Sequence, residues 1–367
     1  MADWFTIDNI EEIDTPALVV YPGRVVQNIR KAISMVDDES RLRPHVKTNK
    51  TLEATELMLQ AGITKFKCAT IAEAEMLGMA QAPDVLLAYQ PQGPKILRLI
   101  ALTKKYASRF SCLVDNTATA HNLSDAAQHN NTVLNVFIDV NVGMNRTGVD
   151  PVECLKLYKY CSSLSGIHLV GLHAYDGHLH QPDFEVRTKA CNEAFSKVEE
   201  LLANISKAGL ANPVIVAGGS PTFPIHAKRN HIECSPGTFI FWDKGYELTC
   251  AEQPFVPAAL VISRIVSQPN PTTICLDLGH KSIASESELN KRVFFLNAPD
   301  FLYKGHSEEH LVVSVPEGHS YKTGDVFYGV PYHICPTVAL YERALIAKEY
   351  MCMGEWKIIA RDRKITI

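Results

Sequence analysis

The sequence contains no segment that predicts a membrane span or a secretory route. Its apolar runs stay well short of the roughly 20 residues that cross a bilayer. Residues 1–8, Met-Ala-Asp-Trp-Phe-Thr-Ile-Asp, lack the basic start and apolar core of a signal peptide. The ten cysteines show none of the framework spacing that disulfide-stapled secreted proteins use. We therefore expect a cytoplasmic protein whose thiols are reduced.

An excess of charge of one sign is absent as well. The formal net charge is −4, and charged residues make up 21% of the 367 residues. This balance leaves no electrostatic footprint for nucleic acid or for an anionic membrane, so we expect neither as a partner. Hydrophobic residues make up 46%, as in ordinary globular proteins. The length allows a large domain plus a smaller one.

Strand-like and helix-like segments alternate through the first two thirds of the chain. Residues 15–21 are expected to form a strand, which Pro22 and Gly23 end. From the stretch 41–50 onward, eight strand–helix units follow one another up to about residue 240. Eight such units with short connections predict an α/β fold, a (β/α)8 TIM-like barrel over residues 23–245. The strand within residues 1–22 is surplus to this barrel and is expected to pair with a second domain.

The pattern changes after Trp242. Short apolar runs are separated by proline, glycine and polar clusters, and no long helix fits among them. One of these runs is Val338–Leu340, which we expect to be a strand. Residues 246–367 are therefore predicted to form an all-β C-terminal domain.

The stretch Arg41–Lys50 contains the strongest candidate for covalent chemistry. It places Lys47 at the carboxyl end of the first barrel strand, where a barrel would position an amine that forms a Schiff base. Such an amine must be partly deprotonated, which burial and cationic neighbours favour, and Arg43 and His45 lie on the same strand. Taken alone, the stretch favours an ordinary surface-loop lysine, and the rest of the chain has to decide.

Two loops rich in small residues predict a phosphate site. The first is Ala217–Thr222, after the seventh barrel strand, and the second is Pro236–Thr238, after the eighth. Small residues let backbone N–H groups approach an anion, and Ser220 and Thr222 add hydroxyl donors. Barrels commonly bind phosphate with these two loops. Either segment alone could be a simple turn, but both at one end of one barrel favour phosphate binding.

The loop Asn141–Gly148, after the fifth strand, carries a fixed cation. Arg146 stands between Gly143 and Gly148 in this loop, at the expected mouth of the barrel. A guanidinium there can bind a phenolate oxygen or a carboxylate. A surface arginine without a ligand is the alternative.

The run Gly171–His180 follows the sixth strand. His173 ends an apolar strand and can lie flat against a planar cofactor, and Tyr175 can face the same cofactor. His178 and His180 make a zinc site conceivable. Because both lie in a probable loop without a neighbouring cysteine, we expect them to be solvated instead.

The segment Pro331–Thr337 in the second domain pairs a histidine with a cysteine. His333 and Cys335 are two residues apart, so in an extended backbone their side chains face the same way. Imidazole and thiolate are good zinc ligands. Two ligands are fewer than usual, so water, substrate or a distant residue would complete the shell. A buried cysteine beside a satisfied histidine is the alternative.

Together these motifs resemble the alanine racemase fold type of pyridoxal 5′-phosphate (PLP) enzymes. The resemblance rests on the lysine of the first strand, the Asn-x-Gly-x-x-Arg-x-Gly loop, the histidine that ends the sixth strand and the two phosphate loops. Within that fold type, Arg-Pro-His-Val-Lys-Thr, Ser-Pro-Gly-Thr and Pro-x-His-x-Cys-Pro-Thr-Val resemble the D-threonine aldolase and D-serine dehydratase branch. The resemblance covers nearly the whole chain.

The resemblance implies a role for each candidate. Lys47 would be the catalytic lysine, and His333 and Cys335 would hold a divalent metal, expected to be zinc. The residues expected to bind PLP are Lys47, His45, Arg146, His173, Tyr175, Gly219, Ser220, Thr222, Gly237 and Thr238. Within this set Arg146 would lie near the phenolic oxygen and His173 against the ring. By analogy we also expect a homodimer with sites at the subunit interface.

Two departures from the branch bear on the reaction. Its aldolases generally pair the metal-binding histidine with an aspartate, whereas Cys335 resembles the zinc-dependent dehydratases. Relatives often have an arginine where this chain has Ser235, which leaves the partner of the pyridine nitrogen open. The second domain also shows no tyrosine motif of the kind that racemases use as a base on the opposite face.

The expected function is therefore that of a PLP- and zinc-dependent D-3-hydroxy amino acid dehydratase. Lys47 would remove the α-proton and zinc would activate the β-hydroxyl, giving a keto acid and ammonia. The nearest alternative is a D-threonine aldolase that cleaves the Cα–Cβ bond, followed by an amino acid racemase. A non-catalytic PLP-binding protein is the alternative from another class, although it would need neither the second domain nor its His-x-Cys pair.

Overall fold

The structure is a computed structural model that describes residues 3–367, and the chain divides into two compact units. Unit 1 contains the chain up to Ile29, Thr48–Ala54 and Thr238–Arg361, and unit 2 contains Arg30–Lys47, Thr55–Gly237 and Asp362–Ile367. The helices α1 (Pro22–Ser34) and α2 (Leu52–Gln60) have residues in both units. No helix of residues 3–367 is long and apolar enough to cross a membrane.

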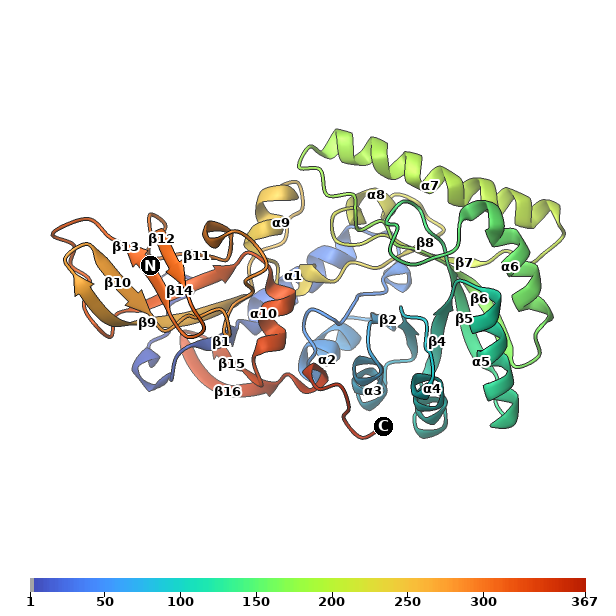
Figure 1. The fold of residues 1–367 in the computed structure, drawn as a ribbon, viewed down its shortest axis with the longest axis horizontal. Coiled ribbons are helices and arrows are strands. Elements are labelled where there is room, and N and C mark those ends of the chain that lie inside the picture. Colours follow the sequence, from blue (N-terminus) through green and yellow to red (C-terminus); the bar gives the residue numbers. More distant parts are fainter. Residues whose placement is uncertain (1–2) are drawn as a thin grey trace. The chain divides into compact units, whose positions relative to one another are not determined.

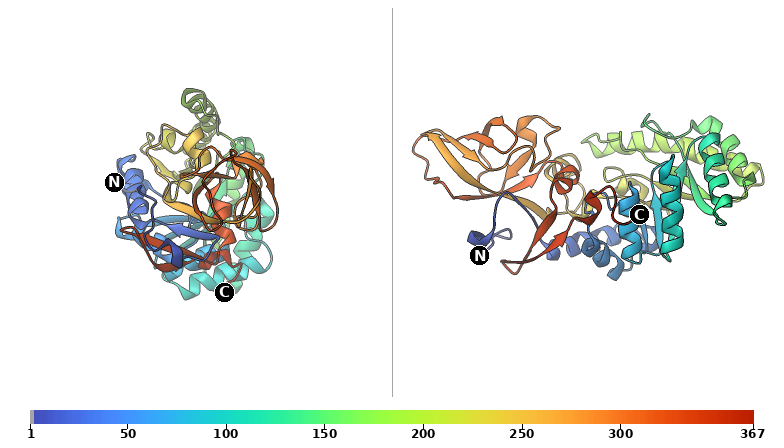
Figure 2. Two further views of the ribbon diagram at one scale, coloured as in Figure 1. Left: turned by 90° about the vertical axis from the view of Figure 1, so that its left-hand side faces the viewer. Right: turned by 60° about the horizontal axis from the view of Figure 1, so that its bottom comes forward.

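Unit 2 is built on a seven-stranded, all-parallel sheet whose strands pair in chain order. The strands are β2 (Lys65–Cys68), β3 (Asp84–Leu87), β4 (Arg109–Val114), β5 (Leu134–Asp139), β6 (Ile167–Ala174), β7 (Val214–Ala217) and β8 (Ile232–Cys234). The helices between them are α3 (Ile71–Met79), α4 (Pro94–Lys105), α5 (Thr117–His129), α6 (Pro151–Ser163), α7 (Phe184–Lys207) and the short α8 (Phe223–His226). The sheet curls, and helices cover its outer face (Figures 1 and 2).

The segment that precedes Lys47 closes this sheet into a barrel. Leu42 forms a parallel bridge with Cys234 of β8, and His45 forms one with Lys67 of β2. The backbone N–H of Arg43 donates to the Cys234 carbonyl at 2.8 Å. On the other side, the N–H of Lys67 donates to the Pro44 carbonyl at 2.8 Å. The predicted (β/α)8 barrel is confirmed. Its first strand is reduced to isolated bridges, because Pro44 has no N–H to donate to a neighbouring strand.

A buried ion-pair cluster lies inside unit 2. Arg43 is 1% exposed. Its Nη1 lies 2.6 Å from Asp84 Oδ1 and its Nε 2.7 Å from Glu233 Oε2. Burial alone would raise the pKa of Asp84, but the charge and hydrogen bond of Arg43 outweigh burial and hold it below its usual value. The cation therefore compensates two carboxylates that contact little solvent.

Replacing Arg43 with methionine is expected to lower the free energy of unfolding by about 3–5 kcal/mol, because it leaves two buried carboxylates without their shared cation. Urea unfolding followed by circular dichroism measures this loss. Arg109→Met is the matched control: Arg109 also pairs with Asp84, but its side chain is 55% exposed. Its loss should stay below about 1 kcal/mol. Equal losses in the two variants would contradict the prediction.

Unit 1 is mostly strand. Its strands are β1 (Ala17–Val20), β9 (Ala259–Asn270), β10 (Thr273–Leu276), β11 (Val293–Phe295), β12 (Leu302–His306), β13 (Leu311–Ser314), β14 (Val326–Pro331), β15 (Arg343–Lys348) and β16 (Met351–Lys357). They form one nine-stranded sheet, in which β14 branches from β9 and pairs with β11. The surplus strand β1 pairs antiparallel with β9 and parallel with β15. It therefore belongs to the sheet of unit 1.

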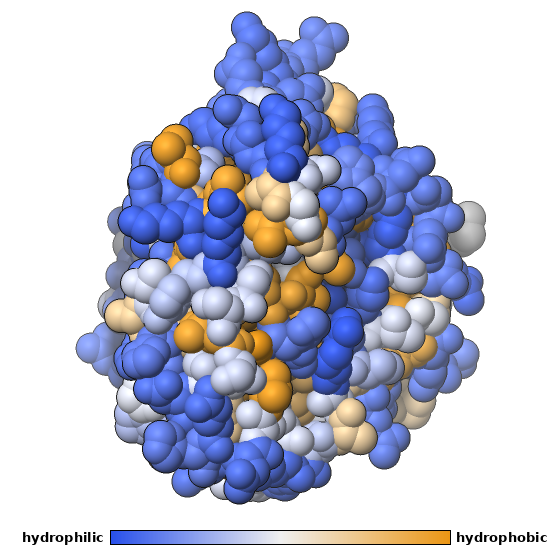
Figure 3. Space-filling model, turned by 90° about the vertical axis from the view of Figure 1, so that its right-hand side faces the viewer, coloured by the Kyte–Doolittle hydropathy of each residue, from blue (hydrophilic) through white to orange (hydrophobic). Residues whose placement is uncertain are grey.

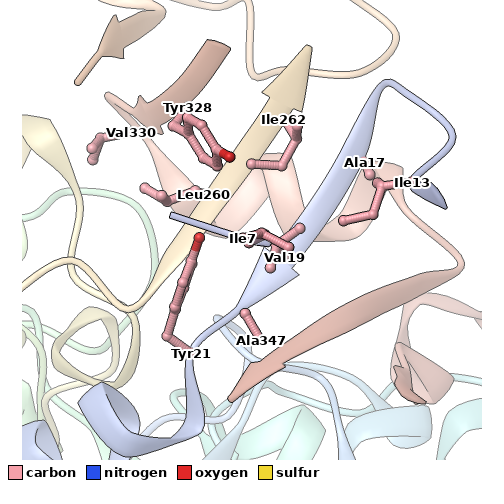
Figure 4. Packing of buried hydrophobic residues seen from close by; sticks show 10 residues of the cluster. All are labelled: Ile7, Ile13, Ala17, Val19, Tyr21, Leu260, Ile262, Tyr328, Val330 and Ala347. Atoms are coloured by element: carbon pink, nitrogen blue, oxygen red, sulfur yellow. The ribbon is translucent and has the colours of Figure 1, made fainter. Parts of the chain in front are cut away.

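Alternating side chains build the core of unit 1. Leu260 and Ile262 of β9, like Tyr328 and Val330 of β14, are two residues apart and so lie on one face of the sheet. These side chains gather into one cluster, which Figure 4 shows. Its buried members are Ile7, Ile13, Ala17, Val19, Tyr21, Leu260, Ile262, Tyr328, Val330 and Ala347.

Unit 1 also contains two short helices, α9 (Lys244–Thr249) and α10 (Ile334–Leu340). The strand expected over Val338–Leu340 is therefore wrong. Pro336 lies in the first turn of α10, where its missing N–H is no handicap, and the Ile334 N–H donates to Asp243 Oδ2 at 3.1 Å.

On the face of the molecule in Figure 3, hydrophilic side chains predominate and apolar ones lie among them in small groups.

Candidate active site

Lys47 lies in a turn directly after the segment that closes the barrel. Its side chain is half-buried, and its backbone N–H donates to His45 Nδ1 at 3.3 Å. The imidazole of His45 is therefore held against the backbone of Lys47. This arrangement places the predicted catalytic lysine at the carboxyl end of the strands, where barrels position reactive groups.

Arg146 and Tyr175 come together in unit 2. The guanidinium carbon of Arg146 lies 5.2 Å from the centre of the Tyr175 ring, within the range of a cation–π contact. The Arg146 loop is shaped by Asn141, whose Oδ1 accepts from the N–H groups of Gly143 and Asn145. Gly148 has a φ of +102°, and a Cβ there would lie 2.7 Å from the Asn141 nitrogen. A glycine is therefore needed at that position.

His173 ends β6 and is 5% exposed. It pairs with Asp139 of β5 in the parallel register, and its Nδ1 lies 2.8 Å from Asp139 Oδ1. Burial lowers the pKa of His173, although the hydrogen bond to Asp139 acts in the opposite direction. A neutral imidazole that donates from Nδ1 to a carboxylate keeps a lone pair on Nε2. The Asp139 contact thus sets the tautomer of His173.

Lys67 is a buried cation that the motif analysis missed. It lies on β2 and is 2% exposed. Its Nζ lies 3.5 Å from His173 Nε2 and hydrogen-bonds to Ser235 Oγ. The pKa of Lys67 is lowered to about 7. Burial is the main cause, and the charge of Lys47 is the largest contribution from a neighbouring side chain. The Phe-Lys-Cys order of β2, a charge between buried apolar residues, was the available signal.

The two predicted phosphate loops meet in unit 2. The N–H of Gly237 donates to Ser220 Oγ at 3.4 Å. Gly218 has a φ of +80°, and a Cβ on Gly219 would lie 3.0 Å from Tyr175 Cε2. Small residues are therefore needed where the first loop passes the tyrosine ring.

A buried chain of hydrogen bonds supports the first loop from beneath. The N–H of Gly219 donates to Thr222 Oγ1 at 3.2 Å, and that hydroxyl donates to Asp176 Oδ1 at 2.8 Å. His226 Nε2 lies 2.8 Å from Asp176 Oδ2. Burial would raise the pKa of Asp176, but its hydrogen bonds with His226 and Thr222 lower it. Thr222 is 0% exposed, so its hydroxyl supports the loop and does not face solvent.

Asp176, His226 and Cys191 form a group that could hold a metal ion, since their ligand atoms all lie within 4.8 Å of one another. However, Arg229 Nη1 donates to His226 Nδ1 at 3.1 Å, so the imidazole proton is on Nε2, facing Asp176. Burial raises the pKa of Cys191 to about 12, which keeps it a thiol. With these partners in place, the three side chains form a hydrogen-bonded network.

Replacing Thr222 with valine is expected to lower the free energy of unfolding by about 1–3 kcal/mol, because Gly219 N–H and Asp176 Oδ1 each lose a buried partner. Chemical denaturation measures the loss. Thr222→Ser keeps the hydroxyl, so its free energy of unfolding should stay close to that of the parent protein. A valine variant as stable as the serine variant would show that the hydroxyl does not support the loop.

The predicted metal pair lies in unit 1, in a different local structure from the one expected. His333 precedes α10 with an extended backbone, but Cys335 lies within the first turn of the helix. The extended backbone predicted across both residues is therefore wrong at Cys335. Cys335 nevertheless acts on His333, since it is among the groups that raise the pKa of the imidazole. Burial would lower the pKa of His333, but Cys335 and Glu286 outweigh it and raise the pKa to about 9.

Several polar groups surround this pair in unit 1. Glu286 Oε1 lies 2.5 Å from His333 Nδ1. Cys335 Sγ lies 3.1 Å from the hydroxyl of Thr48, the residue that follows Lys47 in the chain, and 3.7 Å from that of Thr238. Glu286 was missed because it is far away in sequence, in a segment without a motif.

Comparisons with known proteins agree with this architecture. The model of the alanine racemase N-terminal domain matches residues 20–244, more than half of the chain, and a serine dehydratase domain model matches residues 258–347. A D-threonine aldolase of Arthrobacter sp. is 29% identical, over 96% of this chain and 94% of its own length. A D-threo-3-hydroxyaspartate dehydratase of Delftia sp. (strain HT23) is 23% identical, over 90% and 93%.

Solved structures show the same fold. The crystal structure of D-threonine aldolase from Filomicrobium marinum superposes with a TM-score of 0.88 at 23% identity, covering 95% of this chain and 96% of the other. An alanine racemase of Clostridium difficile 630 gives a TM-score of 0.73 at 12% identity, covering 95% and 99%. The fold and the matched domain model agree, and the chain belongs to the alanine racemase N-terminal domain family.

Proposed function

We propose that the protein is a lyase that uses PLP and zinc to convert a D-3-hydroxy amino acid into a keto acid and ammonia. The observation that supports this most directly is the pair of His333 and Cys335, an imidazole and a thiol in one short segment that interact electrostatically, with Glu286 at the imidazole Nδ1. Its relatives include enzymes named for aldol cleavage and for dehydration of D-hydroxy amino acids.

The residues of unit 2 fit PLP. The loop at Gly218 and Gly219 leaves no space for a Cβ, and the buried hydroxyl of Ser220 lies where the two loops meet. Small residues and hydroxyls of this kind suit a phosphate group. Lys47 would attach the cofactor covalently, and His173 and Tyr175 would lie against its ring. The PLP-binding set proposed here is the one that the resemblance implies, in which the hydroxyl of Thr222, already bonded to Asp176, would act by supporting the loop.

The residues of unit 1 fit a divalent metal. A metal-binding histidine usually donates a hydrogen bond from the N–H of its second ring nitrogen to a carboxylate, and Nδ1 of His333 faces Glu286 Oε1 in this way. The neighbouring thiol of Cys335 adds a soft ligand that zinc accepts readily. One fold relative, D-threo-3-hydroxyaspartate dehydratase, has been solved as a cysteine-to-alanine mutant in a metal-free form, which is compatible with a metal in that enzyme.

Each residue then has a defined task. When bound, PLP supplies an electron sink for the substrate carbanion, and zinc supplies a Lewis acid for the β-hydroxyl. Lys47, released by the substrate amine, would remove the proton from the substrate Cα. Loss of the hydroxyl as water, followed by hydrolysis that consumes one water, gives the keto acid and ammonia. Arg146 would hold an anionic oxygen at the barrel mouth.

A D-threonine aldolase activity is the second candidate. The observation in its favour is that the Arthrobacter aldolase is 29% identical to this chain, against 23% for the Delftia dehydratase. The thiol favours dehydration, because aldolases of this branch generally carry an aspartate at the position of Cys335. Both reactions begin with the same groups and differ in which bond to Cβ breaks.

Product analysis separates the candidates. The purified protein, loaded with PLP and zinc, is incubated with D-serine, D-threonine and 3-hydroxy-D-aspartate, and ammonia, keto acid, glycine and aldehyde are measured. We expect ammonia and keto acid in equal amounts. Glycine with aldehyde would show an aldolase, and the L-enantiomer a racemase. Bound PLP without turnover of any of these substrates would favour a non-catalytic PLP-binding protein.

We further propose that the enzyme acts in the cytoplasm as a homodimer with its sites at the subunit interface, as the resemblance implies. Light scattering coupled to size-exclusion chromatography tests the dimer, and a mass corresponding to one chain would contradict it. The ten cysteines are all free, with seven of them buried, which fits a reducing compartment.

A further inference from the structure

Lys67 is a buried lysine whose hydrogen-bond partners are uncharged. Among residues 3–367, these partners are the hydroxyl of Ser235 and Nε2 of His173. The ring of Tyr175 lies 5.4 Å from Nζ. A lysine buried without a carboxylate partner is unfavourable for folding, because its charged form loses its hydration. Its presence therefore calls for a ligand or a reaction that uses it.

The protons around Lys67 leave one available for a ligand. The hydroxyl of Ser235 donates to the Gly218 carbonyl at 2.8 Å, so its oxygen accepts from Lys67. His173 Nε2 is also an acceptor, because Nδ1 faces the Asp139 carboxylate. An ammonium has three protons, and these two neighbours engage two of them. Lys67 is thus a donor with spare capacity, whereas Ser235 has already committed its only proton.

We propose that Lys67 donates a hydrogen bond to the pyridine nitrogen of bound PLP. The inference rests on the proposed function, since it requires that PLP be the cofactor. Its basis is the position of Lys67 among His173, Tyr175 and Ser235, three side chains at the carboxyl ends of the strands. A pyridine nitrogen without a proton is an acceptor and needs a donor. Ser235, alone at this place, could not supply one.

The alternative is that Lys67 has only a structural role, and stability distinguishes the two. A buried lysine replaced by the apolar, similarly long methionine should not destabilise the protein if the lysine is held for a ligand. We expect the cofactor-free Lys67→Met protein to unfold at a temperature equal to or above that of the parent at pH 7. A clearly lower unfolding temperature would favour a structural role and count against the proposal.

The pH dependence of this difference follows from the lowered pKa. The folded protein releases the Lys67 proton near pH 7, but the unfolded chain retains it up to about its ordinary pKa of 10.5. Stability therefore rises with pH across that window in the parent and not in the variant, so the difference should shrink towards pH 10. The titratable and charged groups around Lys67 are Lys47, Arg43, Asp139, Asp176, His173 and the phenol of Tyr175.

The decisive experiment compares PLP with its 1-deaza analogue, in which a CH group replaces the pyridine nitrogen. Dissociation constants of both are measured for the parent protein and for Lys67→Met, without any substrate. We expect the substitution to weaken PLP binding about 10-fold or more, the typical loss for a hydrogen bond from a charged donor. Binding of the analogue should weaken by less than about 3-fold on the same substitution, because the analogue has no ring nitrogen to accept the hydrogen bond.

Two further outcomes complete the test. Lys67→Arg retains a donor and should keep part of the preference for PLP over the analogue, which also serves if the methionine variant folds poorly. Equal losses for PLP and the analogue would overturn the proposal, since Lys67 would then act on something other than the nitrogen. A parent protein that binds neither compound would instead overturn the proposed function, so the two failures are distinguishable.

Discussion

Lys47→Ala is expected to abolish the absorbance of covalently bound PLP and to slow turnover of D-3-hydroxy amino acids by about 10³-fold or more. The loss combines the covalent attachment with the α-proton base, and a positioned base alone contributes about 10²–10⁴-fold. The variant should still retain some PLP, because the phosphate loops do not involve Lys47. Absorbance spectra and single-turnover assays measure both effects.

The control for this experiment is Lys50→Ala. Lys50 lies three residues further along the chain, and its Nζ contacts the Ala360 carbonyl at 3.5 Å in unit 1. Its removal should leave the PLP absorbance unchanged. If the PLP absorbance survived in Lys47→Ala, the assignment of the attachment lysine would be wrong.

Lys67 is the rival attachment lysine. Its pKa, lowered to about 7, would favour the reactive free amine at neutral pH. It is nevertheless 2% exposed, and its Nζ is engaged by Ser235 and His173, whereas Lys47 is half-buried in a turn. Borohydride reduction of the PLP-loaded protein followed by peptide mapping should therefore label Lys47. A label on Lys67 would reverse the two assignments.

The barrel could be predicted from the sequence because each of its strand–helix units has a local sequence signal. Apolar runs of strand length, helical periodicity and glycine at helix ends repeat along the chain, and the relation between successive parallel strands follows from right-handed connections. The division of the chain into its two compact units was harder to predict from the sequence. Unit 1 takes up Thr48–Ala54 and unit 2 takes up Asp362–Ile367, and these assignments depend on long-range packing that periodicity does not encode.

The candidate site divides in the same way. Residues within motifs, such as Lys47, Arg146 and the two glycine loops, could be named because small residues and fixed cations stand out at the ends of strands. Lys67, Asp139 and Glu286 could not, because each matters through a partner that is distant in sequence. Cys335 was singled out by residue type, but its backbone was misjudged, since Pro336 and Asp243 favour a helix start there.

The metal pair gives the second prediction with a large effect. His333→Ala and Cys335→Ala are each expected to reduce bound zinc from about one per chain to below about 0.1, because two protein ligands leave little affinity when one is lost. Release of ammonia and keto acid should fall by at least about 10²-fold, as the β-hydroxyl loses its Lewis acid. Metal analysis after dialysis and the ammonia assay measure the two effects.

Exchange of the α-proton with deuterated water should survive in these variants. In the proposed mechanism Lys47 would remove that proton without needing zinc, so only the later cleavage at Cβ would depend on the metal. Cys352→Ala, which removes another half-buried thiol of unit 1, is the matched control and should keep its zinc.

Glu286→Gln should weaken zinc binding about 10–100-fold and recover activity in excess metal, because Glu286 orients His333. Full zinc binding in both ligand variants, or unchanged turnover after chelation of the parent, would exclude this pair as the group that decides which bond breaks.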